Sequence, residues 1–458
     1  MFSKRRLVIW VPVVLVAVTI VAAFVLVKSH QPAPANADAA ALPQSGGHHY
    51  NRPDSDVGYG WSFAGDTAAA TEEAVKATGC QDSDLTIAVW TCAHDSQKIL
   101  QTIRRLQPKT QIWGLTSDYG CVLPDGYHHN ASGTVGLLSM KLPGMTVGVG
   151  GAAFDEVAST PQIARLAWQR ALANSHMSAT AKPRMILFSA NFAKIEEPLI
   201  AELDKITGGI PIAGGTSTNQ SNPRGPAKGS VIGGDKVYGQ GLTLCLIFSD
   251  QPVKWTFRGG FDRTSKSGVI TNAESRVIHT IDGRPAAQVY NEWTDGKMGE
   301  VMDRGEDIRK WTGLYPICRQ LTRNGQTHTL FQHVYPMDDW KTSGNLGVSS
   351  NVSTGDHIDF AEGTWNILMN RLGKLPEIAG FGKDDVKTGA AFLICCESVL
   401  KNVPVPERTR IADMMDEQMG EDTPWIGAFT WGEDGNFPGV GNYHGNTLTS
   451  LTLIPRSK

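Results

Sequence analysis

One strand-helix-strand pattern occurs three times in this chain, and it constrains the fold more than any other feature. Each copy begins with a short apolar run, continues with an amphipathic segment and ends in the pattern Ile-x-[Gly/Ala]-x-Thr. The three ending segments are residues 112–116 (IWGLT), 212–216 (IAGGT) and 426–430 (IGAFT). Because enough residues separate the two strands of each copy for a helix, we expect parallel neighbours joined by right-handed crossovers.

The helix of the first copy has recognisable ends. Asp95 is placed to cap it, Ile99 and Ile103 fall on one face, and Pro108 follows its end. After each copy come further strand-like runs, which we expect to pair antiparallel: residues 134–140 and 145–154, 230–232 and 242–248, and 447–453. The sequence therefore predicts an α/β protein with two lobes of mixed sheets flanked by helices and built from a recurring unit. An alternating hairpin at residues 269–283 precedes the expected lobe boundary, between residues 283 and 284.

The N-terminus predicts a membrane anchor. Lys4, Arg5 and Arg6 precede residues 7–27, an uncharged apolar run long enough to span a bilayer as one transmembrane helix. The positive charges before this run place residues 1–6 in the cytoplasm and the bulk of the chain outside the inner membrane. A cleaved signal peptide is the alternative, since residues 35–37 (ANA) have the small-x-small pattern of a cleavage site. Residues 28–56, rich in Pro, Ala, Ser and Gly, are expected to form a flexible tether.

Charge and cysteine content exclude other classes of protein. A net charge of −3 and a pI near 6.5 lack the basic excess that nucleic-acid binding requires. Seven cysteines are too few for a disulfide scaffold of this length. Four of them lie in loops or at strand ends, where an oxidising compartment would permit pairing: Cys80, Cys92, Cys121 and Cys318. The other three, Cys245, Cys395 and Cys396, lie in apolar runs typical of buried thiols.

Polar side chains follow the repeated strands, at the edge where α/β sheets usually bind ligands. The residues expected to hold a small polar ligand there are Thr116, Ser117, Asp118, Thr216, Ser217 and Asn219. Near the third strand, Glu433, His444 and Asn446 offer a carboxylate, an imidazole and an amide for the same purpose. The alternative for all nine residues is structural, with hydroxyl groups capping turns and an acidic glycine-rich turn after the third strand.

Residues 57–455 resemble the FIST family of bacterial signalling proteins. The resemblance depends on GYG at residues 58–60, the helix that follows it, the turns IWGLTSDYG and IAGGTSTNQ, the junction IHTIDGRPAAQVY and the terminal AFTWGEDG with HGNTLTSLTLI. It implies a FIST N-terminal domain at residues 57–283 and a FIST C-terminal domain at residues 284–458. It also implies a sensor of small ligands, with amino acids or haem suggested for the family. Glu397 stands where family members often carry an arginine, which leaves the source of a cation at that strand end open.

We therefore expect a membrane-anchored sensory protein that binds a small polar ligand and signals through a partner protein in the membrane. Catalytic signatures such as G-x-S-x-G and H-E-x-x-H are missing from the sequence, and we expect no metal and no cofactor. Two alternatives stay open. One is an exported hydrolase using Cys92, with His94, or the pair Glu433 and His444. The other is a haem-based gas sensor with one axial histidine: His94, His279, His333 or His444.

Overall fold

Three six-stranded sheets with one common strand order make up most of the protein. A computed structural model describes residues 56–141, 143–157, 159–191, 194–218, 229–420 and 422–456. In sheet order, the first sheet comprises β1 (Val57–Ser62), β6 (Val135–Met140), β2 (Leu85–Trp90), β3 (Gln111–Thr116), β10 (Val231–Gly233) and β11 (Lys236–Tyr238). The second comprises β7 (Met145–Ala153), β12 (Gly241–Ser249), β8 (Met185–Ala190), β9 (Ile212–Thr216), β24 (Gly432–Phe437) and β25 (Gly441–Gly445). The third comprises β13 (Lys254–Gly259), β26 (Leu448–Pro455), β22 (Thr388–Cys396), β23 (Trp425–Thr430), β4 (Cys121–Leu123) and β5 (Gly126–His128).

The middle of each sheet is the repeated unit that the sequence predicts. The pairs β2–β3, β8–β9 and β22–β23 are parallel, and a strand later in the chain pairs antiparallel with the first strand of each pair. This confirms the predicted mixed sheets. The three copies are therefore equivalent in strand order as well as in sequence pattern.

Each sheet is completed by a hairpin that belongs to another copy. The hairpin β10–β11 follows the second copy in sequence but pairs with β3 of the first. In the same way β24–β25 follows the third copy and pairs with β9, while β4–β5 follows the first copy and pairs with β23. Residues 432–445, for which the structural alternative was an acidic glycine-rich turn, form two of these exchanged strands. The exchange closes a cycle through all three copies.

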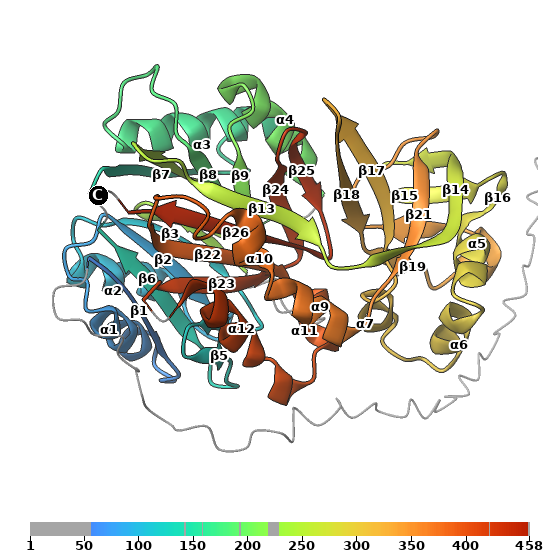
Figure 1. Cartoon of the computed structure of the whole chain (residues 1–458), viewed down its shortest axis with the longest axis horizontal. Helices are drawn as coiled ribbons and strands as arrows, with labels where there is room; N and C mark the ends of the chain where they lie inside the picture. The colour runs from blue at the N-terminus through green and yellow to red at the C-terminus, as the bar shows by residue number, and fades with distance from the viewer. Residues whose placement is uncertain are drawn as a thin grey trace, which may run out of the picture. The chain divides into compact units, whose positions relative to one another are not determined.

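Helices cover the outer faces of the three sheets (Figure 1). One apolar core lies between their inner faces. The central core contains Trp113, Leu187 and Phe392, one from each sheet, with the rings of Trp113 and Phe392 packed edge to face. The first sheet carries α1 (Thr67–Thr78) and α2 (Ser96–Leu106), and the second carries α3 (Thr160–Asn174) and α4 (Glu196–Thr207). The third carries α9 (Trp365–Leu372), α10 (Leu375–Ala379), α11 (Glu397–Asn402) and α12 (Arg410–Met419). The 3₁₀ helix η1 (Val405–Glu407) lies between α11 and α12 in the chain. The Asp95 side chain accepts a hydrogen bond from the Lys98 backbone N–H, so the predicted cap of α2 is confirmed.

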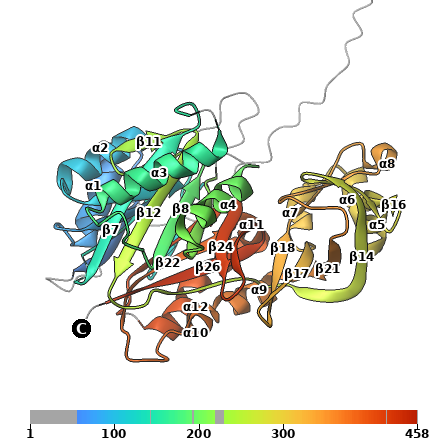
Figure 2. The same ribbon diagram turned by 90° about the horizontal axis from the view of Figure 1, so that it is seen from above.

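A fourth sheet is inserted into the third copy, between β13 and β22, and curls into a near-closed barrel (Figure 2). Its strands are β14 (Asp262–Glu274), β15 (Val277–Ile281), β16 (Arg284–Pro285), β17 (Ile317–Arg323), β18 (Gln326–Gln332), β19 (Val334–Pro336), β20 (Leu346–Val348) and β21 (His357–Glu362). Its helices are α5 (Ala286–Trp293), α6 (Lys297–Asp303), α7 (Ile308–Thr312) and α8 (Trp340–Ser343). The predicted hairpin at residues 269–283 is confirmed as β14 and β15. The boundary predicted between residues 283 and 284 falls between β15 and β16 of this sheet.

The predicted anchor and tether lie outside this description. Residues 1–55 are not among those that the structure describes. Among the described residues, no helix has the length and apolar character needed to cross a bilayer. The anchor at residues 7–27 therefore stays a prediction.

Close packing against the neighbouring strand explains the glycine in the second strand of the first two copies, Gly114 and Gly214. A Cβ atom on Gly214 would lie 1.7 Å from the Phe188 carbonyl oxygen, and one on Gly114 would lie 2.4 Å from that of Ala88.

We expect Gly214→Ala to lower the free energy of unfolding by about 1–3 kcal/mol or more, because β8 and β9 must separate to admit the methyl group. Urea unfolding measures this loss. Gly65→Ala is the matched control, since nothing lies within 4 Å of a Cβ there, and an equal effect of both substitutions would contradict the close approach.

Candidate functional site

The carboxyl ends of the repeated strands are tied to one another by hydrogen bonds. The Thr116 hydroxyl donates to the Thr218 carbonyl oxygen at 2.7 Å, which joins the first copy to the second. The Trp431 backbone N–H donates to the Thr216 carbonyl oxygen at 3.0 Å, and the Phe429 N–H donates to the Ser117 hydroxyl at 3.0 Å. These bonds join the third copy to the other two. The equivalent strand ends that the sequence predicted therefore meet at one junction.

Most of the predicted hydroxyl groups serve this junction. Thr116, Ser117, Thr216 and Ser217 are buried, with at most 2% of each residue exposed. Ser117 donates to the Gly120 carbonyl oxygen at 2.6 Å, and the Ser217 and Asn191 side chains lie 2.8 Å apart. Their polar atoms hold the loops in place. Asn219 lies outside the described residues.

Asp118 belongs to a half-buried group of charged and aromatic side chains that we call the Asp118 cluster, comprising Asp118, Tyr119, His129, Glu397 and Lys401. Lys401 Nζ lies 2.7 Å from Glu397 Oε1 and 5.2 Å from the centre of the Tyr119 ring. The Tyr119 and His129 rings are stacked with centroids 6.4 Å apart. The Asp118 side chain accepts a hydrogen bond from the Cys92 backbone N–H at 3.1 Å. The cluster offers both signs of charge beside two aromatic rings.

Burial and neighbouring charge set the ionisation of this cluster. Burial, with a smaller contribution from Asp118, raises the pKa of Glu397. Burial opposes the charge of Lys401, but the Glu397 carboxylate more than offsets this and raises the pKa of the ammonium group. Lys401 lies one helical turn after Glu397 on α11. Lys401 therefore places a cation beside this strand end.

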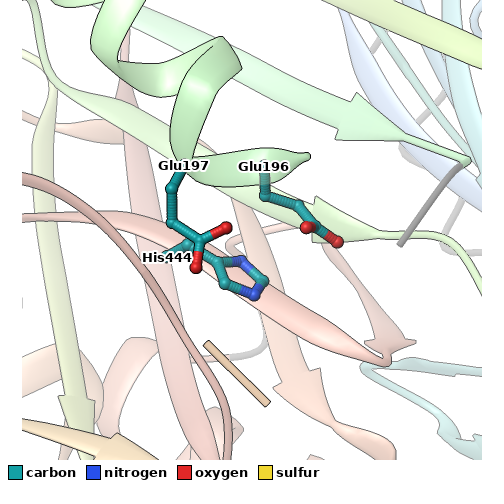
Figure 3. Close-up of side chains that lie close together, drawn as sticks. All are labelled: Glu196, Glu197 and His444. Carbon is teal, nitrogen blue, oxygen red and sulfur yellow. The ribbon is translucent and has the colours of Figure 1, made fainter. Parts of the chain in front are cut away.

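A second, more deeply buried group lies where α4 meets the exchanged hairpin β24–β25. We call it the Glu196 cluster, comprising Glu196, Glu197, Arg276, Asp434 and His444. Glu196 and Glu197 begin α4, and Figure 3 shows them extending toward the ring of His444 from β25. Arg276 Nη2 donates to Glu196 Oε2 at 2.8 Å and to Glu197 Oε2 at 2.6 Å. Because Arg276 comes from the turn between β14 and β15, the cluster also joins the second sheet to the fourth.

His444 contacts Asp434, and Glu433 points away from both. His444 Nδ1 lies 2.8 Å from Asp434 Oδ1. Asp434 pairs with His444 across the hairpin and Glu433 pairs with Gly445, so alternation along the strand sends Glu433 to the opposite face of the sheet. There its carboxylate accepts hydrogen bonds from the Thr430 hydroxyl and the Leu448 backbone N–H. The predicted Glu433 and His444 pair is therefore divided between two faces.

The Glu196 cluster has strongly perturbed ionisation. Burial lowers the pKa of His444, but the Glu196 and Asp434 carboxylates more than compensate and raise it to about 9. Burial raises the pKa of Asp434, and it also raises the pKa of Glu433 on the other face. Perturbed ionisable groups concentrated in one place are typical of functional sites, although structural ion pairs also produce them.

Asn446 lies next to this region and is held by the backbone. Its side-chain nitrogen donates to the Trp431 carbonyl oxygen at 2.5 Å. Among the described residues, its amide oxygen is buried without a hydrogen-bond partner. Asn446 thus stays close to the strand end where the sequence analysis placed it.

Several residues of these clusters escaped the sequence analysis. Arg276, Lys401 and the two glutamates at the start of α4 have no motif around them. Acidic residues in the first turn of a helix are common for reasons of helix stability alone. Glu196 and His444 lie 248 positions apart in the chain and meet only because the hairpin is exchanged. One signal could have pointed to some of these residues: the helix of a repeat begins directly after the end of a strand.

The cysteines and two of the histidines considered as haem ligands, His94 and His333, have structural surroundings. The seven cysteines are present as buried thiols. Cys92 Sγ lies 3.9 Å from the Thr218 carbonyl oxygen, and His94 Nδ1 lies 3.3 Å from the Thr67 hydroxyl. His333 is buried, with Nε2 3.0 Å from the Arg309 carbonyl oxygen. His94 packs against Gly133, where even an added Cβ would lie 2.5 Å from Nε2. The tightly packed surroundings of His94 and His333 do not fit a haem.

Comparison with known proteins identifies part of the chain. Residues 84–284 match the FIST N domain. This range runs from β2 to β16 and includes Asp118, Glu196 and Arg276, but not the exchanged hairpin with His444. A comparison with curated proteins finds no match. The match covers less than half of the chain and shows that this region is similar to the FIST N domain, a type of sensory domain.

Loss of the arginine in the Glu196 cluster should destabilise the folded protein. We expect Arg276→Ala to lower the free energy of unfolding by about 3–5 kcal/mol, because it leaves buried carboxylates without their cation. Arg284→Ala is the matched control: Arg284 pairs with Glu292, and the two side chains are 52% and 56% exposed, so little change is expected. Chemical denaturation of both variants measures the two changes in the free energy of unfolding. Equal stability of the two would show that Arg276 is not a structural cation.

Proposed function

We propose that this protein is a membrane-anchored, extracytoplasmic sensor that binds a small zwitterionic ligand, such as an amino acid, at the Asp118 cluster. The FIST N domain match supports a sensory role. The observation that carries the choice of ligand is the pairing of opposite charges beside aromatic rings at the strand ends.

The chemistry of the Asp118 cluster suits a ligand with both an ammonium and a carboxylate group. Asp118 and Glu397 would accept hydrogen bonds from the ammonium group, and Lys401 would face the carboxylate. Tyr119 and His129 would pack against the aliphatic part or the cation. Asp118, Tyr119, His129 and Lys401 are each partly exposed, so a ligand can reach them from solvent. The buried threonines and serines of the junction would keep these side chains in position.

A sensor outside the membrane needs a way to transmit binding. The apolar run at residues 7–27, with basic residues before it, supports anchoring by a single helix. The ligand would act across the membrane through a partner protein whose state the bound form favours. The predicted FIST C-terminal domain, residues 284–458, is part of this proposal and would contain the repeated strands of the third copy and most of the inserted sheet.

Ligand binding at the Asp118 cluster can be tested on the purified full chain with a panel of free amino acids. At least one should raise the thermal midpoint without being consumed, because a ligand that binds only the folded state stabilises it. Lys401→Met should weaken binding about tenfold or more in calorimetry, through loss of one charge-assisted contact.

The control for this test is Lys76→Met, which removes the equivalent partner of an i,i+4 pair with Glu72 on α1 and should leave binding unchanged. A panel without any stabilising member, or equal affinities of the wild type and Lys401→Met, would refute the proposed site.

Anchoring has a separate test. In cell fractionation we expect the full chain in the membrane fraction and a chain lacking residues 1–28 in the soluble fraction, because the apolar run holds the protein in the bilayer. Intact-mass measurement of the membrane-extracted protein should find residues 7–27 still attached. A mature N-terminus directly after Ala37 would instead establish the cleaved signal peptide.

A further inference from the structure

We propose that Glu196, Glu197 and His444 form a binding site for a divalent transition-metal ion such as Zn²⁺, for which Arg276 is the competing cation. The site lies in the Glu196 cluster and not in the Asp118 cluster. It therefore stands or falls independently of the organic ligand proposed above.

The ligand atoms are already close together. One coordinating atom from each of Glu196, Glu197 and His444 lies within 4.8 Å of the others. Around a tetrahedral zinc ion with bonds near 2.1 Å, ligand atoms lie about 3.4 Å apart. Small side-chain rotations would therefore bring these three groups onto one ion. Water can complete the coordination, because Glu197 keeps 24% of its side chain exposed.

The orientation of His444 points independently to a ligand. Its side chain is 1% exposed, and Asp434 contacts Nδ1 at 2.8 Å. The other ring nitrogen, Nε2, is buried and has no hydrogen-bond partner among the described residues. A carboxylate that fixes one nitrogen of a histidine while the other stays available is the usual second-sphere arrangement of metal-binding histidines. A metal ion on Nε2 would take the place of a proton.

A divalent ion can replace the positive charge that this site already holds. Glu196, Glu197 and Asp434 contribute three carboxylates, and Arg276 is the permanent cation that contacts them. Asp434 Oδ2 is also buried without a partner in the described part of the chain. Because a bound ion would displace the guanidinium and take the place of the imidazole proton, its two positive charges would replace the two that the site loses. Mixed imidazole and carboxylate ligands favour Zn²⁺ or its neighbours over Mg²⁺ and Ca²⁺, which prefer oxygen alone.

The position of Arg276 gives metal binding a structural consequence. The same two carboxylates that would bind the ion hold Arg276, and Glu197 Oε1 also accepts the Asn351 backbone N–H at 2.7 Å. Arg276 and Asn351 both belong to the inserted region that contains the fourth sheet, and Ser275 next to Arg276 donates to the Asn351 side chain. A bound ion would displace the guanidinium and loosen the β14–β15 turn from α4. The site would thus couple metal occupancy to the attachment of the fourth sheet.

The test is calorimetric titration of the tag-free full chain with Zn²⁺, compared with Mg²⁺. We expect one Zn²⁺ per chain, with binding at least about tenfold tighter in Arg276→Ala, because the competing cation is gone. Binding should be at least about tenfold weaker in His444→Ala. His176→Asn is the control, because it removes an exposed histidine whose positive φ of 56° an asparagine tolerates. Its affinity should equal that of the wild type.

A second readout covers the case in which Arg276→Ala does not fold without metal. Arg276→Lys retains a positive charge and gives a folded comparison, and Zn²⁺ should then restore the thermal unfolding transition of Arg276→Ala. In the wild type, Zn²⁺ should increase hydrogen exchange in residues 270–281. The proposal fails if neither the wild type nor an arginine variant binds one equivalent of Zn²⁺, or if His444→Ala binds it as the wild type does. Zn²⁺ binding without a change in that exchange would refute the competition with Arg276.

Discussion

The exchange of hairpins between the three copies is the constraint on which the rest of this structure depends. The second strand of each repeat would otherwise be an open sheet edge with unpaired backbone groups. Each edge is instead covered by a hairpin from the next copy in the cycle, through β10, β24 and β4. No copy can complete its sheet alone. The three sheets consequently share one apolar core, to which each contributes its inner face.

The exchange also explains where the polar clusters lie. The second strand of each repeat ends beside two other elements. One is the beginning of a helix from the same copy, and the other is a hairpin from another copy. At the second copy this brings Glu196 and Glu197 to His444 and Asp434. At the third it brings Glu397 and Lys401 to the loop that carries Asp118 and Tyr119. At the first copy the corresponding position holds Ser96, whose hydroxyl lies 2.6 Å from that of Ser230. One architecture therefore supports three chemically different junctions.

The two charged junctions differ in how deeply they are buried, and this difference determines what each can do. The Asp118 cluster is partly exposed, so its charges can be exchanged for those of a ligand at modest desolvation cost. The Glu196 cluster is covered by α4 and by the fourth sheet, so removing or adding a charge there affects the packing of both. The inserted sheet matters because Arg276 lies at its β14–β15 turn. A sequence insertion in the third copy thus supplies the cation for a site built on the second.

The sequence by itself determined the repeated unit, its parallel strand pairs, the cap of α2 and the hairpin at residues 269–283, because these follow from local periodicity and short-range hydrogen bonding. It also located Asp118 and His444 as residues of interest. Only the tertiary structure decided which hairpin completes which sheet, because pairing between distant strands leaves no local pattern. For the same reason it alone decided that His444 meets Asp434 and Glu196 and not Glu433. Neighbouring residues of a strand point to opposite faces, so a shift of register by one residue moves a side chain to the other face. Which side chains meet each face is decided by packing across the whole chain.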